Sequence, residues 1–243
     1  MIDAVLFDVG NTLLHSRVST PTAALDLAVR PVYDRLVELD FKLPPFAQYS
    51  RMIRRRFVRS HLWSRIVRRE VSIIKGLQRA HSHLGVSLSM ERTAELCRES
   101  ISAVAAIFTV DEDAKDVIAK LREMNVKLGL VSNTILPGFT IDEFLGSEGF
   151  LDCFPVRIYS SDVGYMKPSP KIFRLALEQL EVAPERAAFI GDRVDNDVLG
   201  ASRLGMKTVL FIPGGKLPRE WDCADHTIRR LTEIPGIVGN RSM

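Results

Sequence analysis

The sequence predicts an α/β protein in which a doubly wound parallel sheet carries an inserted helical domain. In the second half of the chain, short apolar segments alternate with segments of helical spacing, as in parallel sheets covered by helices on both faces. Between Ser16 and about Ile107 there is little period-2 alternation, and apolar residues recur at helical spacing. We therefore expect a core formed by residues 1–15 and 110–243, with a helical domain over 16–109.

The core begins with a buried strand, Ala4-Val5-Leu6-Phe7, whose four apolar residues are followed directly by Asp8. The remaining elements should follow in alternating order: a helix over 112–124, a strand over 126–131, a helix over 168–180, a strand over 187–190, a helix over 196–204 and a strand over 208–212. Asp8, Ser132 and Asp192 each come just after one of these strands. Because the carboxyl ends of parallel strands form the ligand crevice, we expect these side chains to share one site.

The inserted segment should contain about four helices. Its first part has apolar residues at helical spacing, namely Ala24, Leu25, Ala28, Val32, Leu36 and Leu39. The turns Leu43-Pro44-Pro45 and Gly85-Val86-Ser87 interrupt the helical pattern. The last residues, Gly239 to Met243, have the composition of a frayed tail.

Composition predicts a soluble cytoplasmic protein. No stretch approaches the ~18–20 apolar residues that span a bilayer, and the N-terminus has no secretory pattern, so no membrane role is expected. Three cysteines, Cys97, Cys153 and Cys223, lack zinc-like spacing and are expected to be reduced and buried. A net charge of +3 is too small to indicate nucleic-acid binding. The sequence leaves open a monomer or a homodimer.

The segment that follows the first strand contains a carboxylate, a Gly/Asn turn and a hydroxyl, in the order Asp8-Val9-Gly10-Asn11-Thr12. This layout resembles the signature of the haloacid dehalogenase (HAD) superfamily, aspartate–any–aspartate–any–threonine. In the family's phosphatases the first aspartate is the nucleophile and the second is the general acid/base. The resemblance implies that Asp8 is a nucleophile and that Thr12 holds the phosphoryl group, whereas Gly10 lacks the acid/base side chain.

Two further segments resemble the next HAD motifs. The strand Leu128-Gly129-Leu130-Val131 ends on Ser132, whose hydroxyl, with neighbouring backbone N–H groups including that of Asn133, would bind a phosphoryl oxygen. Alone, this segment is also typical of an ordinary Ser/Asn turn. Lys167, in Gly164-Tyr165-Met166-Lys167-Pro168, would balance the charge of the nucleophile and the transition state. Pro168 is expected to start the following helix.

The fourth segment, Gly191-Asp192-Arg193-Val194-Asp195-Asn196-Asp197, resembles the acidic motif of the family. Clustered carboxylates repel one another unless a cation lies among them, and hard oxygen ligands suit Mg²⁺. The resemblance implies that Mg²⁺ is held by Asp8, Asp192 and the backbone carbonyl of Gly10, with Asp197 supporting it from the second shell. The alternative is an acidic run that only caps the next helix. The helical insert resembles the C1-type cap, and the phosphorylated substrate is expected to be a small molecule.

The glycine at position 10 leaves three functions open. The first is a Mg²⁺-dependent phosphohydrolase that is slow or selective for good leaving groups, since positioned proton transfer contributes ~10²–10⁴-fold. His15 could donate the proton, although a solvent-facing hinge role is favoured. The second is a 2-haloacid dehalogenase or phosphonatase-like hydrolase. Dehalogenases have a Ser-Asn pattern where this chain has Gly191-Asp192, and Lys42 and Lys75, the only cap lysines, match no Schiff-base motif. The third is a phosphate- or metal-binding protein without turnover.

The second helix of the insert is strongly cationic. No acidic residue occurs from Phe41 to Arg69, and eight arginines lie between Arg51 and Arg69. Guanidinium groups suit phosphate and carboxylate, so Arg54 and Arg55 are candidates for binding an anionic substrate or partner. The alternative is a solvated helix face, which is the usual role of a charge run.

Overall fold

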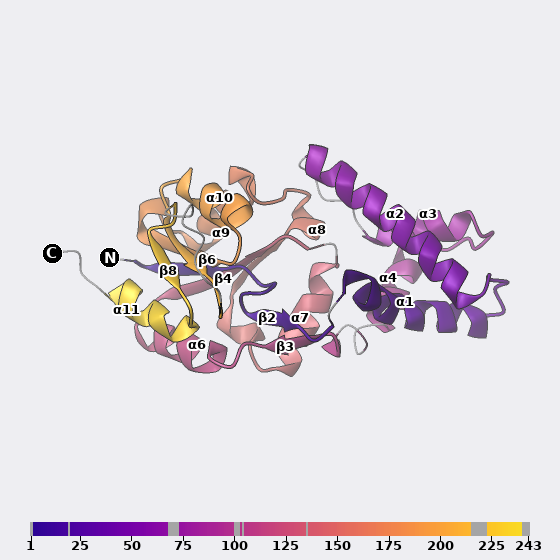
Figure 1. Ribbon diagram of the computed structural model, residues 1–243, viewed down its shortest axis with the longest axis horizontal. Coiled ribbons are helices and arrows are strands. Elements are labelled where there is room, and N and C mark those ends of the chain that lie inside the picture. The colour runs from indigo at the N-terminus through magenta and orange to yellow at the C-terminus, as the bar shows by residue number, and fades with distance from the viewer. Residues whose placement is uncertain are drawn as a thin grey trace.

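The computed structural model describes residues 2–18, 20–67, 73–99, 103, 105–134, 136–214 and 223–239. Its centre is a six-stranded sheet in the order β5-β4-β1-β6-β7-β8, and every pairing between neighbours is parallel (Figure 1). The strands are β1 (Ala4–Phe7), β4 (Lys127–Ser132), β5 (Val156–Tyr159), β6 (Ala187–Gly191), β7 (Lys207–Phe211) and β8 (His226–Ile228). The α/β fold predicted from the sequence is confirmed.

The central strands are apolar along their whole length because helices cover both faces of the sheet. Every residue of β1 has no exposed surface, and β1 lies between β4 and β6. One face packs against α6 (Ala114–Glu123), α7 (Gly138–Ser147) and α11 (Ile234–Gly239); the other packs against α9 (Pro170–Leu180) and α10 (Leu199–Ser202). The two apolar cores fix the position of the carboxyl ends of the strands.

Two of the predicted helix starts are corrected. Helix α9 begins at Pro170 and not at Pro168, because Ser169 has φ −60° and ψ 128°. A residue that precedes proline is disfavoured in the helical region, so Pro170 keeps Ser169 extended. The helix predicted over 196–204 instead begins as a π-helical turn, Val194–Val198, which continues into α10.

Between β1 and β4 the chain forms a helical lobe, seen beside the sheet in Figure 1. Within the described residues it contains α1 (Pro21–Glu38), α2 (Phe46–Val67), α3 (Ile73–Ser82) and α4 (Met90–Glu99). An antiparallel ribbon of β2 (Leu14–Ser16) and β3 (Phe108–Val110) connects the lobe to the core, and the domain boundaries predicted from the sequence fall inside it. The side chains of Arg65 and Arg69 and the tail 240–243 lie outside the described part.

The cysteines differ from the expectation that all are buried. All three are free thiols; Cys97 is buried, Cys153 is half-buried and Cys223 is exposed. Cys223 lies in the turn that leads into β8, the strand at the edge of the sheet. None of the helices in the described part of the chain combines the length and apolar character that a bilayer-spanning helix requires.

Candidate active site at the carboxyl edge of the sheet

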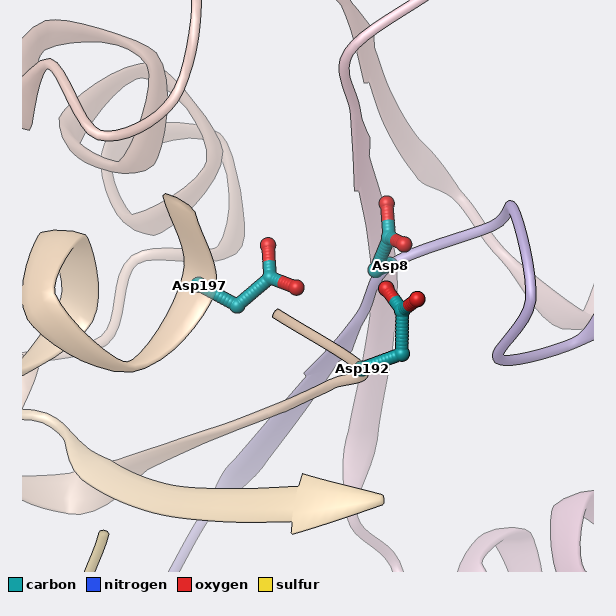
Figure 2. Close-up of side chains that lie close together, drawn as sticks. All are labelled: Asp8, Asp192 and Asp197. Atoms are coloured by element: carbon teal, nitrogen blue, oxygen red, sulfur yellow. The ribbon is translucent and has the colours of Figure 1, made fainter. Parts of the chain in front are cut away.

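Three acidic side chains converge at the carboxyl edge of the central strands (Figure 2). Asp8 follows β1, Asp192 follows β6, and Asp197 lies in the π-helical turn after β6. Each offers one carboxylate oxygen, and these oxygens all lie within 4.8 Å of one another. The structure thus brings together the two carboxylates that the sequence proposed as metal ligands, Asp8 and Asp192, and the Asp197 carboxylate proposed to support them.

The absence of a side chain at Gly191 permits this arrangement. A Cβ atom at this position would lie 2.3 Å from Oδ2 of Asp197. That oxygen accepts a hydrogen bond from the backbone N–H of Arg193 at 3.0 Å. Glycine and the π-helical turn together let the Asp197 carboxylate fold back against the end of β6, as π-bulges at functional sites often do.

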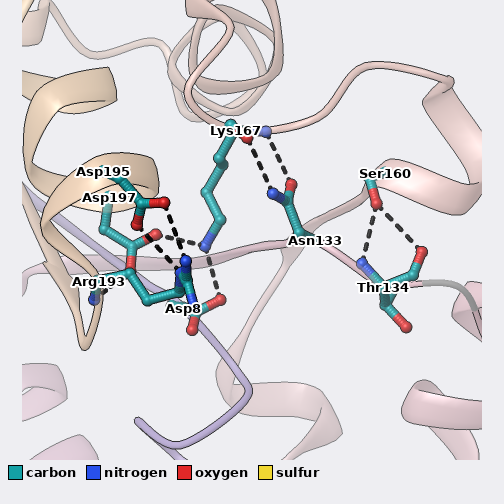
Figure 3. A network of polar contacts seen from close by, with 8 residues as sticks. All are labelled: Asp8, Asn133, Thr134, Ser160, Lys167, Arg193, Asp195 and Asp197. Carbon is teal, nitrogen blue, oxygen red and sulfur yellow. Dashed lines mark hydrogen bonds and ion pairs between the residues drawn. The ribbon is translucent and has the colours of Figure 1, made fainter. Parts of the chain in front are cut away.

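Lys167, three residues before the start of α9, bridges two of the carboxylates (Figure 3). Its Nζ donates to Oδ1 of Asp8 at 2.6 Å and forms an ion pair with Oδ1 of Asp197 at 2.7 Å. The lysine, Asp8 and Asp197 are all buried. Charge-assisted contacts of this length, away from water, are among the stronger polar interactions in proteins.

The electrostatics of the site favour an additional cation. Burial, followed by the charges of Asp197 and Asp192, raises the pKa of Asp8 to about 7 although Lys167 opposes the shift. Burial, with the charge of Asp197, also raises the pKa of Asp192. Burial lowers the pKa of Lys167, but Asp197 and Asp8 together outweigh this effect and raise it.

With all four groups ionised, three carboxylates and one ammonium carry a net charge of −2, which a divalent cation would neutralise. Hard carboxylate oxygens are ligands that suit Mg²⁺. The residues present therefore fit the metal that the sequence implies.

The side chain of Asn133 makes contacts that the sequence did not predict. Its Oδ1 accepts from the backbone N–H of Lys167 at 2.7 Å, and its Nδ2 donates to the carbonyl of Lys167 at 3.0 Å. The side chain therefore holds the lysine backbone in place, and the backbone N–H of Asn133 is still a candidate for the proposed phosphate contact. Ser160 makes a similar two-way bridge to the backbone of Thr134 (Figure 3).

The two predicted phosphate-binding hydroxyls are buried. Ser132 ends β4 beside the nucleophile strand. Oγ1 of Thr12 has no hydrogen-bond partner within the described structure and no exposed surface. A buried hydroxyl without a partner costs about 1–3 kcal/mol, so a small movement that offers Thr12 an acceptor would be favourable.

Sequence reasoning missed Asn11. Its side chain hydrogen-bonds to the Asp192 carboxylate, which partly opposes the rise in the pKa of that group. Asn11 has φ +58°, in the left-handed region where asparagine is enriched. An asparagine directly after the glycine of the nucleophile loop was the available signal, but it indicated only a turn.

None of the remaining candidate residues has a described contact with this cluster. His15, the proposed proton donor, lies half-buried in β2 of the connecting ribbon, where its Nε2 is 2.7 Å from Oδ2 of Asp111. Lys42 and Lys75 are exposed on the helical lobe. Arg54 lies 3.9 Å from Asp26, and no described contact joins Arg54 or Arg55 to the carboxylates.

Comparison with known proteins identifies the class. The haloacid dehalogenase-like hydrolases match residues 2–205, and the chain belongs to this family. A glyceraldehyde 3-phosphate phosphatase of Methanopyrus kandleri is 38% identical over 133 residues, which cover 52% of this chain and 55% of that protein. The chain thus spans about half the length of this curated relative.

Two solved structures share the whole fold. A HAD phosphatase from Thermococcus onnurineus has a TM-score of 0.63 and 28% identity, with 100% of both chains covered. A 2-haloacid dehalogenase from Pseudomonas syringae pv. Tomato DC3000 has a TM-score of 0.69 and 21% identity, with 98% of both chains covered. At that identity, the second likeness concerns the fold and not the reaction.

Proposed function

We propose that this protein is a Mg²⁺-dependent phosphohydrolase that forms an aspartyl-phosphate at Asp8. The proposal rests on one arrangement of side chains. Nζ of Lys167 lies 2.6 Å from Oδ1 of Asp8, and carboxylate oxygens of Asp8, Asp192 and Asp197 lie within 4.8 Å of one another. A phosphoryl group needs a nucleophile, fixed positive charge and a divalent cation, and this set of residues suits all three.

The chain's own residues divide the work as follows. Lys167 bonds to Oδ1 of Asp8, so Oδ2 is free to attack phosphorus. The bond from phosphorus to the leaving oxygen breaks, and that oxygen takes its proton from solvent or from the substrate. Water then attacks the aspartyl-phosphate, which releases inorganic phosphate and regenerates the Asp8 carboxylate. Ser132 and Thr12 orient the phosphoryl oxygens, and Lys167 balances their charge.

Mg²⁺, when bound by Asp8, Asp192 and the Gly10 carbonyl, would neutralise charge on the phosphoryl oxygens. Asp197 supports this arrangement from the second shell, since Lys167 and the Arg193 N–H already engage both of its oxygens. The aspartate thereby fixes the lysine and the metal ligands relative to each other.

The glycine at position 10 restricts the substrate. Without a positioned acid, a leaving group that needs protonation departs slowly, whereas an acyl or aryl phosphate does not need it. We therefore propose a small phosphorylated substrate with a good leaving group. The phosphatase names of relatives such as the M. kandleri protein support a small phosphorylated molecule.

The test is phosphate release from p-nitrophenyl phosphate and acetyl phosphate with and without Mg²⁺. We expect activity that requires the metal and is lost in Asp8→Asn, with a phosphorylated protein trapped by acid quench in the wild type only. Turnover that survives Asp8→Asn would exclude Asp8 as the nucleophile. Halide release from 2-haloacids without metal would establish a dehalogenase, and Mg²⁺ binding without any turnover would indicate a binding protein.

A further inference from the structure

The helical lobe contains a pocket of about 710 Å³ between α2 and α3. This volume lies within the range of ~300–1,000 Å³ typical of small-molecule sites. The pocket is bounded entirely by the lobe, so it is distinct from the carboxylate cluster. Its walls are formed by Pro44, Gln48, Arg51, Met52, Arg55, Arg56, Arg59, Gly76, Arg79 and Leu84.

One face of α2 builds most of this wall. Positions 48, 51, 52, 55, 56 and 59 follow the i, i+3, i+4, i+7 spacing of a single helix face. This face carries four arginines, of which Arg51, Arg55 and Arg59 are exposed. Tyr49 and Ile53, on another face of α2, are buried against Leu77 and Ala80 of α3, so the apolar contact between the two helices lies beside the pocket.

These guanidinium groups have no counter-charge within the described residues. No described carboxylate forms an ion pair with any of the five pocket arginines, which are the four of α2 and Arg79 of α3. Arg54, one position away on α2, pairs instead with Asp26 outside the pocket. Five like charges around one concavity produce a positive potential that low-dielectric walls focus on an incoming anion.

We propose that this pocket binds a small molecule that carries two or more phosphate groups. Guanidinium forks match phosphate geometry, and several forks around one cavity match several phosphates. Met52 and Leu84 supply apolar wall for the uncharged part of such a ligand. The wall at Gly76 borders open space, because a Cβ atom there would meet no atom within 4 Å. The proposal does not depend on the phosphohydrolase activity of the core.

The test is isothermal titration of the full-length Asp8→Asn protein in EDTA, so that neither turnover nor metal-dependent binding at the core contributes. The probes are inorganic tripolyphosphate, fructose 1,6-bisphosphate and inorganic phosphate. We expect the first two to bind and inorganic phosphate to bind at least about tenfold more weakly, since each charge-assisted contact is worth about tenfold or more. Tighter binding of tripolyphosphate would indicate an inorganic ligand, and tighter binding of fructose 1,6-bisphosphate would indicate an organic one.

Two further variants locate the binding. Arg55→Gln combined with Arg79→Gln should weaken it by about tenfold or more. Arg55→Gln alone should already weaken binding, and Arg54→Gln is its matched control, since it removes one charge from the same helix outside the pocket and should change affinity by less than about twofold. An equal loss in both proteins would overturn the pocket in favour of a diffuse basic surface. Tighter binding of a single-stranded oligonucleotide, lost to the same extent in the double variant and in Arg54→Gln, would also overturn the proposal. The proposal fails as well if neither tripolyphosphate nor fructose 1,6-bisphosphate binds.

Discussion

Replacement of Gly10 by aspartate tests the proposed chemistry at the position where this chain departs from the family signature. Gly10 is exposed, and a Cβ atom built on it meets no atom within 4 Å. Its φ lies outside the left-handed region, so a side chain can be added without backbone strain. The variant should therefore fold normally and place a carboxyl two residues from the nucleophile.

The size of the effect depends on the leaving group. A positioned acid/base contributes about 10²–10⁴-fold, and the gain should be largest for alkyl phosphates, whose leaving oxygens need a proton. For p-nitrophenyl phosphate the gain should be smaller. The assay is kcat/KM for a series of aryl and alkyl phosphates, plotted against the pKa of the leaving alcohol. The wild-type plot should fall steeply, and the Gly10→Asp plot should be flatter.

Gly10→Asn is the matched control, because it has nearly the same shape and no acidic proton. The asparagine variant should retain the steep dependence of the wild type. An equal gain from asparagine and aspartate would show that the side chain acts by packing and not by proton transfer. A Gly10→Asp protein that folds, binds Mg²⁺ and shows no gain on alkyl phosphates would refute the assignment of the defect to position 10.

Two other changes probe the structure around the site, and a third probes the helical lobe. Gly191→Ala should lower activity about 10–100-fold, measured with Mg²⁺ titration, because its Cβ would lie 2.3 Å from Oδ2 of Asp197 and displace it. Lys167→Met should cost about 3–5 kcal/mol in urea unfolding, since Asp8 and Asp197 lose their buried partner; unchanged stability would argue against the ion network.

In the helical lobe, burial lowers the pKa of His81 to about 4, against about 6.5 when unfolded. Between these values the unfolded state binds more protons, so stability should fall as pH drops from about 6.5 to 4, by at most about 3 kcal/mol. His81→Gln should lack this component when its unfolding is compared with wild type across that range, and identical pH profiles would contradict the assignment.

Much of the core was predictable because its strands are buried on both faces. Such strands appear in the sequence as continuous apolar runs, as in Ala4–Phe7 and Ala187–Gly191. Helix starts were less predictable, because they depend on backbone states that several residues decide together. Helix α9 starts at Pro170 because that proline keeps the residue before it extended. The turn at Val194–Val198 is π-helical, which the local spacing of apolar residues does not predict.

The candidate site also has parts that the sequence predicts and parts that it does not. Asp8, Lys167 and Asp192 could be predicted as candidate site residues because each lies next to the end of a strand or the start of a helix, within a motif. The use of Asn133 was not, since its partners are backbone atoms of Lys167, 34 positions later in the sequence. The two arginines of α2 that looked equivalent in sequence differ in structure: Arg54 pairs with Asp26, and Arg55 lines the pocket. The rotation of α2 relative to α3 decides which arginine lines the pocket, and the composition of the segment does not show that rotation.

The geometry of the buried charges helps to decide whether the glycine at position 10 indicates a protein that has lost its activity or an enzyme that is selective for its substrate. Burial of several ions is costly, and apolar residues of similar volume often give equal or better stability. A protein needing only a stable fold would gain nothing from a buried Lys167 held between Asp8 and Asp197, or from a glycine at 191 that leaves room for the Asp197 carboxylate. Phosphoryl and cation chemistry does require them. Because Gly10 retains its backbone carbonyl, Mg²⁺ affinity should be the same in wild type and Gly10→Asn, and only the proton-transfer step should respond to an acid at this position.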